Sequence, residues 1–390
     1  MPKINRFAEM HKDITAWRRD LHENPEILFD THRTSAFVAE KLREFGCDEV
    51  VTGIGRTGVV GVIKGKQGGS GKVIGLRADM DALPMTETSG VPHASKIEGA
   101  MHACGHDGHT AMLLGAAAYL AETRNFDGTA VVIFQPAEEG GGGGKEMVDD
   151  GMMERFDIQE VYGMHNYPGL KVGEFAMRVG PLMAATDQFT IHVEGKGGHA
   201  ANPKACIDTT LVASHIVVAL QSVVSRNTDP LDSLVLSVTS FETESKAYNI
   251  IPQRVEIRGT CRSLTPEVRE MAQERVNAIA KSTAQAFGAT AKVDYNLGYP
   301  VTKNHEKQTE FAAKIAEDVS GGDMVHTDTP PVMGGEDFSY MLEARPGAFV
   351  FVGNGDTATL HHPDYDFNDE LIPAGCSYWV KIIEQGMPAS

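Results

Sequence analysis

Residues 130–139 read Ala-Val-Val-Ile-Phe-Gln-Pro-Ala-Glu-Glu, a run of five apolar residues followed by a turn signal and two adjacent carboxylates. A short unbroken apolar run of this kind is typical of a strand that is buried on both faces. Open α/β sheets place their sites beyond the carboxyl ends of such strands, so Glu138 and Glu139 stand where chemistry is expected. This stretch therefore predicts both a buried sheet and the edge of the sheet that carries the site.

Strand and helix patterns alternate on both sides of this run. Buried strands are expected at residues 59–64, 73–77 and 348–352, where apolar residues again follow one another. Apolar residues recur at helical spacing in residues 14–23, 34–45, 112–122, 306–319 and 375–385. This alternation predicts an α/β fold, a mostly parallel sheet with helices on both faces.

The pattern changes between residues 185 and 297. Strands with alternating apolar and polar residues are expected at 188–194, 234–241, 254–262 and 290–296, and long helices at 209–225 and 266–287. Strands that are polar on one face, combined with two helices, indicate a separate α+β unit. We therefore expect a discontinuous catalytic domain (residues 1–184 and 298–390) that carries an inserted lid or dimerisation domain (residues 185–297).

Composition narrows the classes of partner. The 390 residues have a formal net charge of −18 and no cluster of Lys and Arg. Nucleic acid or an anionic membrane would favour such a cluster, so we expect neither, and a small-molecule ligand is the better expectation. The chain opens without a signal-peptide pattern, and its five scattered cysteines fit reduced thiols. Both observations favour a cytoplasmic location.

Residues 102–109, His-Ala-Cys-Gly-His-Asp-Gly-His, place three imidazoles and a thiol within eight positions. Thiolate sulfur and neutral imidazole nitrogen are ligands that a borderline-soft divalent cation prefers, so the cluster predicts a transition-metal site, with zinc as the default. A second interpretation makes Cys104 a nucleophile with a histidine base. It is less favourable, because a reactive thiol ordinarily needs one nearby base and not several ligands.

Further ligand-type side chains follow other predicted strands. His165 comes just after a short apolar run, and His361 and His362 follow the strand expected at 348–352. Of two adjacent carboxylates, one can bind a metal while the other holds a water as general base, which is what a metal-assisted hydrolase requires. Each group alone could be a solvated acid or a hydrogen-bonded loop histidine. A metal-stabilised binding protein without turnover is the alternative from another class, and the presence of Glu138 counts against it.

The glycine run at 140–144, followed by Lys145, does not fit a phosphate-binding loop. That motif needs a glycine and a Ser or Thr at the positions held here by Glu139 and Glu146. We interpret the run as a flexible turn that carries the backbone away from a crowded site.

Six stretches of the chain resemble the amidohydrolase branch of the co-catalytic metallopeptidases, which includes hippurate hydrolases and N-acyl-amino-acid amidohydrolases. They are residues 77–84 (RADMDALP), 101–109 (MHACGHDGH), 135–140 (QPAEEG), 163–165 (GMH), 195–200 (GKGGHA) and 335–339 (GEDFS). Residues 18–26 (RRDLHENPE) also resemble that branch, so the likeness runs essentially from end to end.

The resemblance implies a role for each group at the predicted sheet edge. Two divalent ions would be ligated by Cys104, His106, Glu139, His165 and His361. His362 stays open as the alternative to His361, because neighbouring imidazoles can exchange roles. Glu138 would be the general base, and Asp81 would orient a ligand. His102 and His109 are then expected to support the site or to begin the helix.

The inserted domain is implied to contribute three more residues. His199 would stabilise the oxyanion, often in the active site of the other subunit. Asn249 and Arg262 would hold the substrate carboxylate, a task that suits the planar fork of arginine. A turn histidine and a surface ion pair are the simpler interpretations of His199 and Arg262. A homodimer or a dimer-based tetramer is expected.

Together these observations predict a metal-dependent amidohydrolase that cleaves N-acyl amino acids, with N-benzoyl or N-acetyl groups among the expected substrates. Zinc is the first expectation for both ions, and manganese, cobalt or nickel would also suit the ligand set. The alternative is a metallo-carboxypeptidase or dipeptidase that acts on small peptides.

Overall fold

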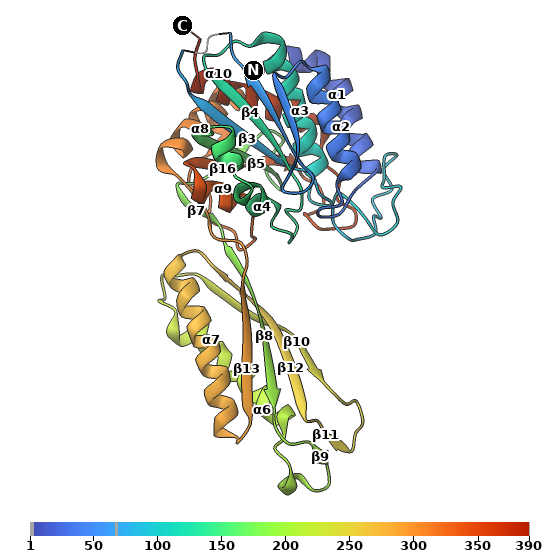
Figure 1. The fold of residues 1–390 in the computed structure, drawn as a ribbon, viewed down its shortest axis with the longest axis vertical. Helices are drawn as coiled ribbons and strands as arrows, with labels where there is room; N and C mark the ends of the chain where they lie inside the picture. The colour runs from blue at the N-terminus through green and yellow to red at the C-terminus, as the bar shows by residue number, and fades with distance from the viewer. Residues whose placement is uncertain (1–3, 67–68, 390) are drawn as a thin grey trace. The chain divides into compact units, whose positions relative to one another are not determined.

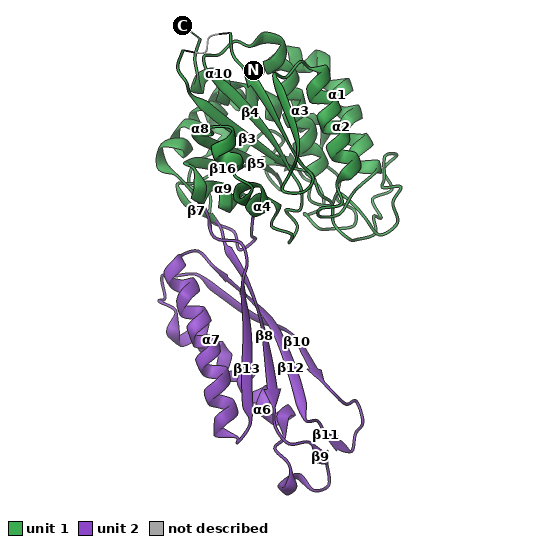
Figure 2. Cartoon of the chain, viewed as in Figure 1, with its two compact units in different colours: residues 1–182, 303–330, 337–390 green, residues 183–302, 331–336 purple. Residues whose placement is uncertain are grey.

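The computed structural model describes residues 4–66 and 69–389. The chain divides into two compact units (Figure 2). Unit 1 comprises residues 1–182, 303–330 and 337–390, and unit 2 comprises residues 183–302 and 331–336. Unit 2 therefore takes in a short segment, 331–336, that lies well beyond the boundary expected from the sequence. Two short strands, β7 (Gly180–Met183) and β14 (Thr302–Asn304), carry the chain between the units.

An eight-stranded sheet with the order β1-β2-β4-β3-β5-β16-β6-β15 forms the middle of unit 1 (Figure 1). Its four central strands, β4, β3, β5 and β16, are parallel to one another, while β2 and β1 continue the sheet in antiparallel fashion. The strands are β1 (Glu49–Ile54), β2 (Gly58–Lys64), β3 (Val73–Asp79), β4 (Thr129–Gln135), β5 (Glu160–Pro168), β6 (Phe175–Ala176), β15 (Val325–His326) and β16 (Gly347–Gly355).

Strand β16 shows that both faces of this sheet are covered. Ala348, Val350 and Val352 lie in the main core, together with residues of α3, α8 and α10. The intervening Phe349 points to the other face, where its ring lies 5.4 Å from that of Phe338 in α9. The predicted α/β fold is confirmed. The helices are α1 (Arg6–Glu23), α2 (His32–Glu44), α3 (His106–Thr123), α4 (Gly143–Asp149), α5 (Met152–Arg155), α8 (Glu306–Ser320), α9 (Phe338–Ala344) and α10 (Ile372–Gly386).

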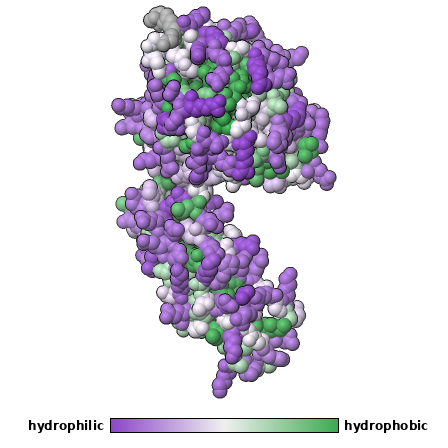
Figure 3. Space-filling view, in the orientation of Figure 1, coloured by the Kyte–Doolittle hydropathy of each residue, from purple (hydrophilic) through white to green (hydrophobic). Residues whose placement is uncertain are grey.

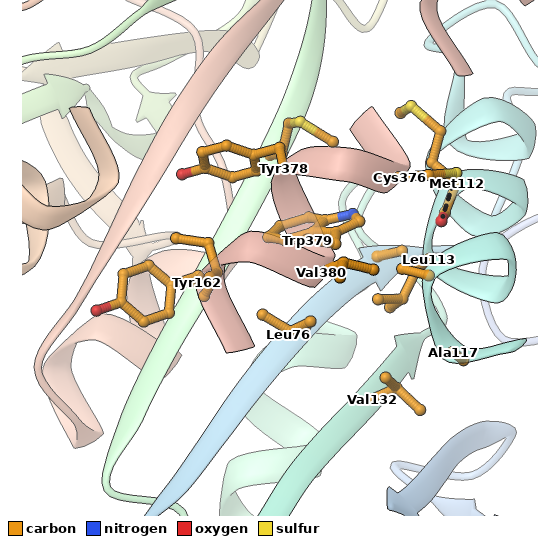
Figure 4. Packing of buried hydrophobic residues seen from close by; sticks show 14 of the residues in the cluster. Leu76, Met112, Leu113, Ala117, Val132, Tyr162, Cys376, Tyr378, Trp379 and Val380 are labelled. Carbon is orange, nitrogen blue, oxygen red and sulfur yellow. Dashed lines mark hydrogen bonds between the residues drawn. The ribbon is translucent and has the colours of Figure 1, made fainter. Parts of the chain in front are cut away.

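The core of unit 1 fixes the helix that begins at the histidine cluster. Figure 4 shows Trp379 and Val380 of α10 in the same cluster as Leu76 of β3 and Leu113 of α3. Trp379 is 1% exposed, and the Cys376 thiol donates to the Met112 carbonyl oxygen over 3.2 Å. Because α3 is buried along most of its length, its first turn is held rigidly over the sheet edge.

Unit 2 is built on an antiparallel sheet with the order β10-β12-β8-β13. Its strands are β8 (Ala185–Glu194), β10 (Leu234–Thr243), β12 (Arg254–Ser263) and β13 (Thr290–Leu297). Alternate residues such as Ile191 and Ile257 pack against α6 (Thr209–Ser222) and α7 (Pro266–Ala286), while the other face is polar. This is the α+β pattern that the alternating strands predicted.

Two local signals start the helices of unit 2. The Asp208 side chain accepts hydrogen bonds from the backbone N–H groups of Thr210 and Leu211, and Thr265 caps α7 in the same way. The helical stretch Thr209–Asn227 is long and apolar enough to cross a membrane, but that is weak evidence, because core helices pass the same test. Space-filling colours show hydrophobic residues of both units in separate patches among hydrophilic ones (Figure 3).

Candidate active site and metal centre

The ligand-type side chains of unit 1 gather at the carboxyl ends of its parallel strands. Glu138 and Glu139 follow β4, and His165 lies near the end of β5. His106 is the first residue of α3, and Cys104 precedes it by two positions. His361 lies in the loop after β16. Parallel strands end at the same edge of a sheet, which brings these segments together.

Two of the five groups of donor atoms found among the described residues contain only predicted ligands, and these two overlap. Cys104, His106 and His165 form one group, and Cys104, Glu139 and His361 form the other, with the donor atoms of each group within 4.8 Å of one another. The Cys104 thiol is common to both. A shared thiolate between two sets of N and O donors suits a pair of divalent ions. His362 belongs to neither group among the described residues, so the geometry favours His361.

Hydrogen bonds set the direction of the two buried imidazoles. The Nδ1 atom of His106 lies 2.8 Å from the Asp81 carbonyl oxygen, and Nδ1 of His165 lies 2.7 Å from the Asn166 carbonyl oxygen. A carbonyl can only accept, so Nδ1 of each ring carries a proton, and Nε2 is the atom left for a metal. The Nε2 atom of His106 is buried without a hydrogen-bond partner in the described chain, with the Asp79 carboxylate 3.6 Å away. These features fit a metal ligand.

Carboxylates behind the donors fix the acidic pair. The two oxygens of Asp81 accept the backbone N–H groups of Glu138 and Glu139 over 2.9 and 3.1 Å.

His109 is held on both sides of its ring. Asp79 lies 2.6 Å from Nδ1 of His109, whose Nε2 accepts the backbone N–H of Asn166. His109 is therefore a supporting residue in the first turn of α3. This agrees with the sequence expectation.

The electrostatics of the cluster call for a cation. Burial, together with the carboxylates of Glu139 and Glu138, raises the pKa of the Cys104 thiol well above its usual value. Burial lowers the pKa of His106, but the carboxylates of Asp79 and Asp81 outweigh it and raise that pKa to about 10. A divalent ion would replace these protons and favour both the thiolate and the neutral imidazole.

Comparison with known proteins agrees with this geometry. Residues 75–385 match the sequence pattern of peptidase family M20/M25/M40. The chain belongs to this family. It is 43% identical to the hippurate hydrolase of Campylobacter jejuni over 98% of each chain, and 40% identical to the N-acetyl-L-cysteine deacetylase of Bacillus subtilis over 94% of this chain and 86% of that one. A crystal structure of a Bacillus subtilis protein, described as a dinuclear metal-binding peptidase of the M20 family, superposes with a TM-score of 0.84 at 33% identity, covering 97% and 99% of the two chains.

The glycine run of this M20 chain begins as a turn at residues 138–141, where Gly140 has open space around it, and its later glycines are tightly packed. A Cβ atom on Gly143 would overlap the Pro136 carbonyl oxygen, and one on Gly144 would lie 2.9 Å from the Asp337 carbonyl oxygen. The same glycines begin α4. Ala137, just before the acidic pair, has φ of 55°, a left-handed conformation that non-glycine residues rarely adopt. The backbone at Glu138 is thus held in a strained turn.

A buried network that the sequence analysis did not single out lies behind Glu138. The Arg77 guanidinium donates to the carboxylates of Asp79 and Asp337 over 2.9 and 3.0 Å, and Gln135 donates to Asp337 over 2.7 Å. The backbone N–H of Asp337 in turn points at the Glu138 carboxylate, at 3.4 Å. The stretches 77–84 and 335–339 resembled the family, but nothing local in them indicates that they meet.

The three predicted residues of unit 2 do not lie together. His199, in β9 (Gly198–His199), pairs with Ile250 in β11 (Ile250–Ile251), and the carbonyl of Asn249 accepts the backbone N–H of Ala200. Both His199 and Asn249 are exposed. Arg262 lies at the other end of β12, about 26 Å along the strand from Arg254, which follows β11 closely. Unit 2 therefore presents these side chains at two separate ends.

Proposed function

We propose that this M20 protein hydrolyses the amide bond of N-acyl amino acids to a carboxylic acid and a free amino acid. The observation that carries the proposal is a buried carboxylate, Glu138, next to a donor set for two divalent ions. The names of the hippurate hydrolase and N-acetyl-L-cysteine deacetylase relatives support an N-acyl amino acid as substrate.

Five side chains would hold the two ions: Cys104, His106, Glu139, His165 and His361. When bound, the ions would polarise the amide carbonyl and lower the pKa of the attacking water. Zinc suits a set of one thiolate, three imidazoles and one carboxylate, and manganese, cobalt or nickel would also fit.

Glu138 would act as the general base. It follows Glu139 directly but is held apart from it, because each backbone N–H is bound to a different oxygen of Asp81. The Glu138 carboxylate would take a proton from the attacking water as the C–O bond forms. It would then give that proton to the amide nitrogen as the C–N bond breaks, which releases the free amine.

Unit 2 would bind the polar ends of the substrate. His199 would donate to the oxyanion, and Asn249 and Arg262 would hold the carboxylate of the amino acid. His199 and Asn249 are far from Arg262 within one unit 2, so we propose that two copies of the chain complete each site. The assembly would be a homodimer or a dimer-based tetramer.

Unit 2 offers a surface for that assembly. Leu211 and Val218 of α6 are 49% and 72% exposed, and β10 lies at an edge of the sheet with no further strand beyond it in the described chain. Apolar side chains beside an open strand edge suit pairing with a second copy.

The five cysteines are free, which supports a reducing, cytoplasmic location.

A substrate panel tests the proposal. Purified protein would be assayed on N-benzoylglycine, N-acetyl amino acids and dipeptides, after chelation and after separate return of zinc, manganese, cobalt or nickel. We expect release of free amino acid that depends on metal. Turnover that survives complete metal removal would contradict it and would favour Cys104 as a nucleophile. Cleavage of dipeptides alone would favour the carboxypeptidase or dipeptidase alternative.

A further inference from the structure

A second cluster of buried charges lies beside the candidate metal centre, built on Arg18 of α1. The Arg18 side chain is completely buried. Its Nη2 atom donates to the Asp366 carboxylate and to the Phe367 carbonyl oxygen, each over 2.6 Å, and its Nε atom donates to Asp369 over 2.9 Å. Its Nη1 atom lies 3.7 Å from the carboxylate of Asp107. The proposed chemistry uses none of these side chains.

This cluster joins two segments that carry candidate ligands. Asp107 directly follows His106, while Asp366 and Asp369 lie five and eight residues after His361. The guanidinium of Arg18 therefore sits between the start of α3 and the loop that leads away from His361. A planar group with five N–H donors can hold several acceptors in fixed directions, which an ammonium group cannot do.

A parallel connection runs through Tyr365. The Tyr365 hydroxyl donates to the side-chain oxygen of Asn166, and the side-chain nitrogen of Asn166 donates to the Cys104 carbonyl oxygen, both over 2.6 Å. The backbone N–H of His361 also donates to the Ala103 carbonyl oxygen. Residues 361–369 are thus tied to the Cys104 turn at several points.

The two donor groups depend on these ties to different degrees. The rings of His106 and His165 are held by the carbonyl oxygens of Asp81 and Asn166, and Arg18 forms no hydrogen bond with any of these four residues. His361 is different, since its side chain is 52% exposed and its backbone has φ of 62°. Its ring reaches the Glu139 carboxylate over 3.2 Å from a loop, so its position depends on what fixes that loop.

Stability alone is a poor explanation for a buried arginine. Removing a cation and its carboxylate partners from water costs as much as their attraction returns, so apolar packing would stabilise the fold at least as well. A buried charge network of this kind is better explained by a need to hold functional side chains in a fixed geometry.

We propose that Arg18, with Asp366, is a positioning residue for His361 and thereby sets the affinity of the Cys104–Glu139–His361 metal position. The inference rests on the ligand set given under the proposed function. It assigns the Arg18 cluster to one of the two ions and not to both.

Competition between the metal-free protein and a chromophoric zinc chelator tests this assignment. The proteins are wild type, Arg18→Lys, Asp366→Asn and, as a matched control, Arg19→Lys. Arg19 contacts the same Asp369 carboxylate from the solvent side, with its own side chain 48% exposed. The second Zn²⁺, which is the ion that requires His361, should bind about 10–100-fold more weakly in Arg18→Lys and, in the same direction, in Asp366→Asn. The other Zn²⁺ should keep its affinity, and Arg19→Lys should match wild type for both ions.

Urea unfolding of the metal-free proteins separates positioning from stability. A lower free energy of unfolding with an unchanged second-ion affinity, or an equal weakening of both ions, would overturn the inference. Asp366→Asn removes a single charge from a side chain that is 31% exposed and keeps the test decisive if Arg18→Lys does not fold. His361→Ala separates failure of the ligand set from failure of this inference. Two ions of unchanged affinity in that variant would overturn the ligand set and this inference with it, whereas loss of the second ion there, with normal binding in Arg18→Lys and Asp366→Asn, would overturn this inference alone.

Discussion

The candidate residues of unit 1 are mostly buried and held by hydrogen bonds, whereas two of the three in unit 2 are exposed. Glu138 is 7% exposed, and its backbone N–H is bound by Asp81. His199 lies on a two-residue strand, and its ring Nδ1 accepts a hydrogen bond from the nearby backbone N–H of Ala201. Preorganised groups cost no rearrangement during a reaction, while an exposed side chain needs a further surface to fix it. The proposed metal ligands therefore all come from one chain, whereas the proposed substrate-binding groups of unit 2 need a further surface.

The largest expected effect tests the buried side of this comparison. Glu138→Gln keeps the shape of the side chain but removes the base, so kcat should fall about 10³-fold. Both ions should still bind, because Glu138 is not among the proposed ligands. Steady-state kinetics together with metal analysis by mass spectrometry check this, and full activity in a variant with two bound ions would contradict the role of base.

The exposed side is tested by His199→Ala, for which we expect a loss of about 10²–10³-fold in kcat, as for other oxyanion donors. The matched control is His192→Ala, on the open face of the unit 2 sheet between Glu256 and Asp294. This control should behave as wild type.

Mixing two inactive variants tests whether His199 of one chain serves the site of another chain. If His199 serves the partner's site, equal amounts of Glu138→Gln and His199→Ala, unfolded and refolded together, should recover about a quarter of wild-type activity through mixed dimers. Recovery that never exceeds the sum of the separate variants would place both residues in the site of one chain.

A pH-dependent stability difference is expected from His22 in unit 1. Burial lowers the pKa of His22, but the carboxylates of Asp107 and Glu87 outweigh it and raise the pKa to about 9. The stabilisation by protonated His22 is fully present below the unfolded pKa of 6.5 and is lost as the pH rises through 9. His22→Gln should therefore lower the free energy of unfolding by about 3 kcal/mol at pH 6 and by less at pH 9.5.

Urea unfolding of equally metal-loaded proteins at both pH values measures this difference. A difference between His22→Gln and wild type that does not shrink toward high pH would mean that His22 is not protonated in the native state.

The smallest effect should come from Arg262 in unit 2. Arg262→Lys keeps the charge but loses the planar fork, so KM should rise about tenfold with little change in kcat. Arg258→Lys, on the same face of β12 and paired with Glu256, is the control and should leave KM unchanged. A fall in kcat with constant KM would show that Arg262 acts in the transition state and not in binding the ground-state carboxylate.

Most strands and helices could be predicted because their periodicity is local. Strand β1 (Glu49–Ile54) was missed, since it lies at the sheet edge and is mostly exposed or half-buried, which leaves little pattern. The segment 331–336 groups with unit 2 through bonds such as that from the Ala184 N–H to the Val332 carbonyl, nearly 150 residues away in the chain. No local signal reports a contact of that range.

The same limit applies to the candidate site. The candidate metal ligands could be predicted because most of them follow a recognisable strand, and the resemblance to a family assigned each one a role. The residues behind them could not, since Arg77 and Asp337 meet over 260 positions and the close approach of Gly144 to Asp337 reads as simple flexibility in the sequence. Which residues hold a ligand's orientation depends on tertiary packing more than on any motif.

The bond between Arg18 and Asp369 spans 351 residues, and it has a consequence for synthesis on the ribosome. Cys104 and His106 are synthesised about 250 residues before His361 and the loop that holds it. A growing chain would therefore offer the first proposed ligands well before His361 could complete the Cys104–Glu139–His361 position.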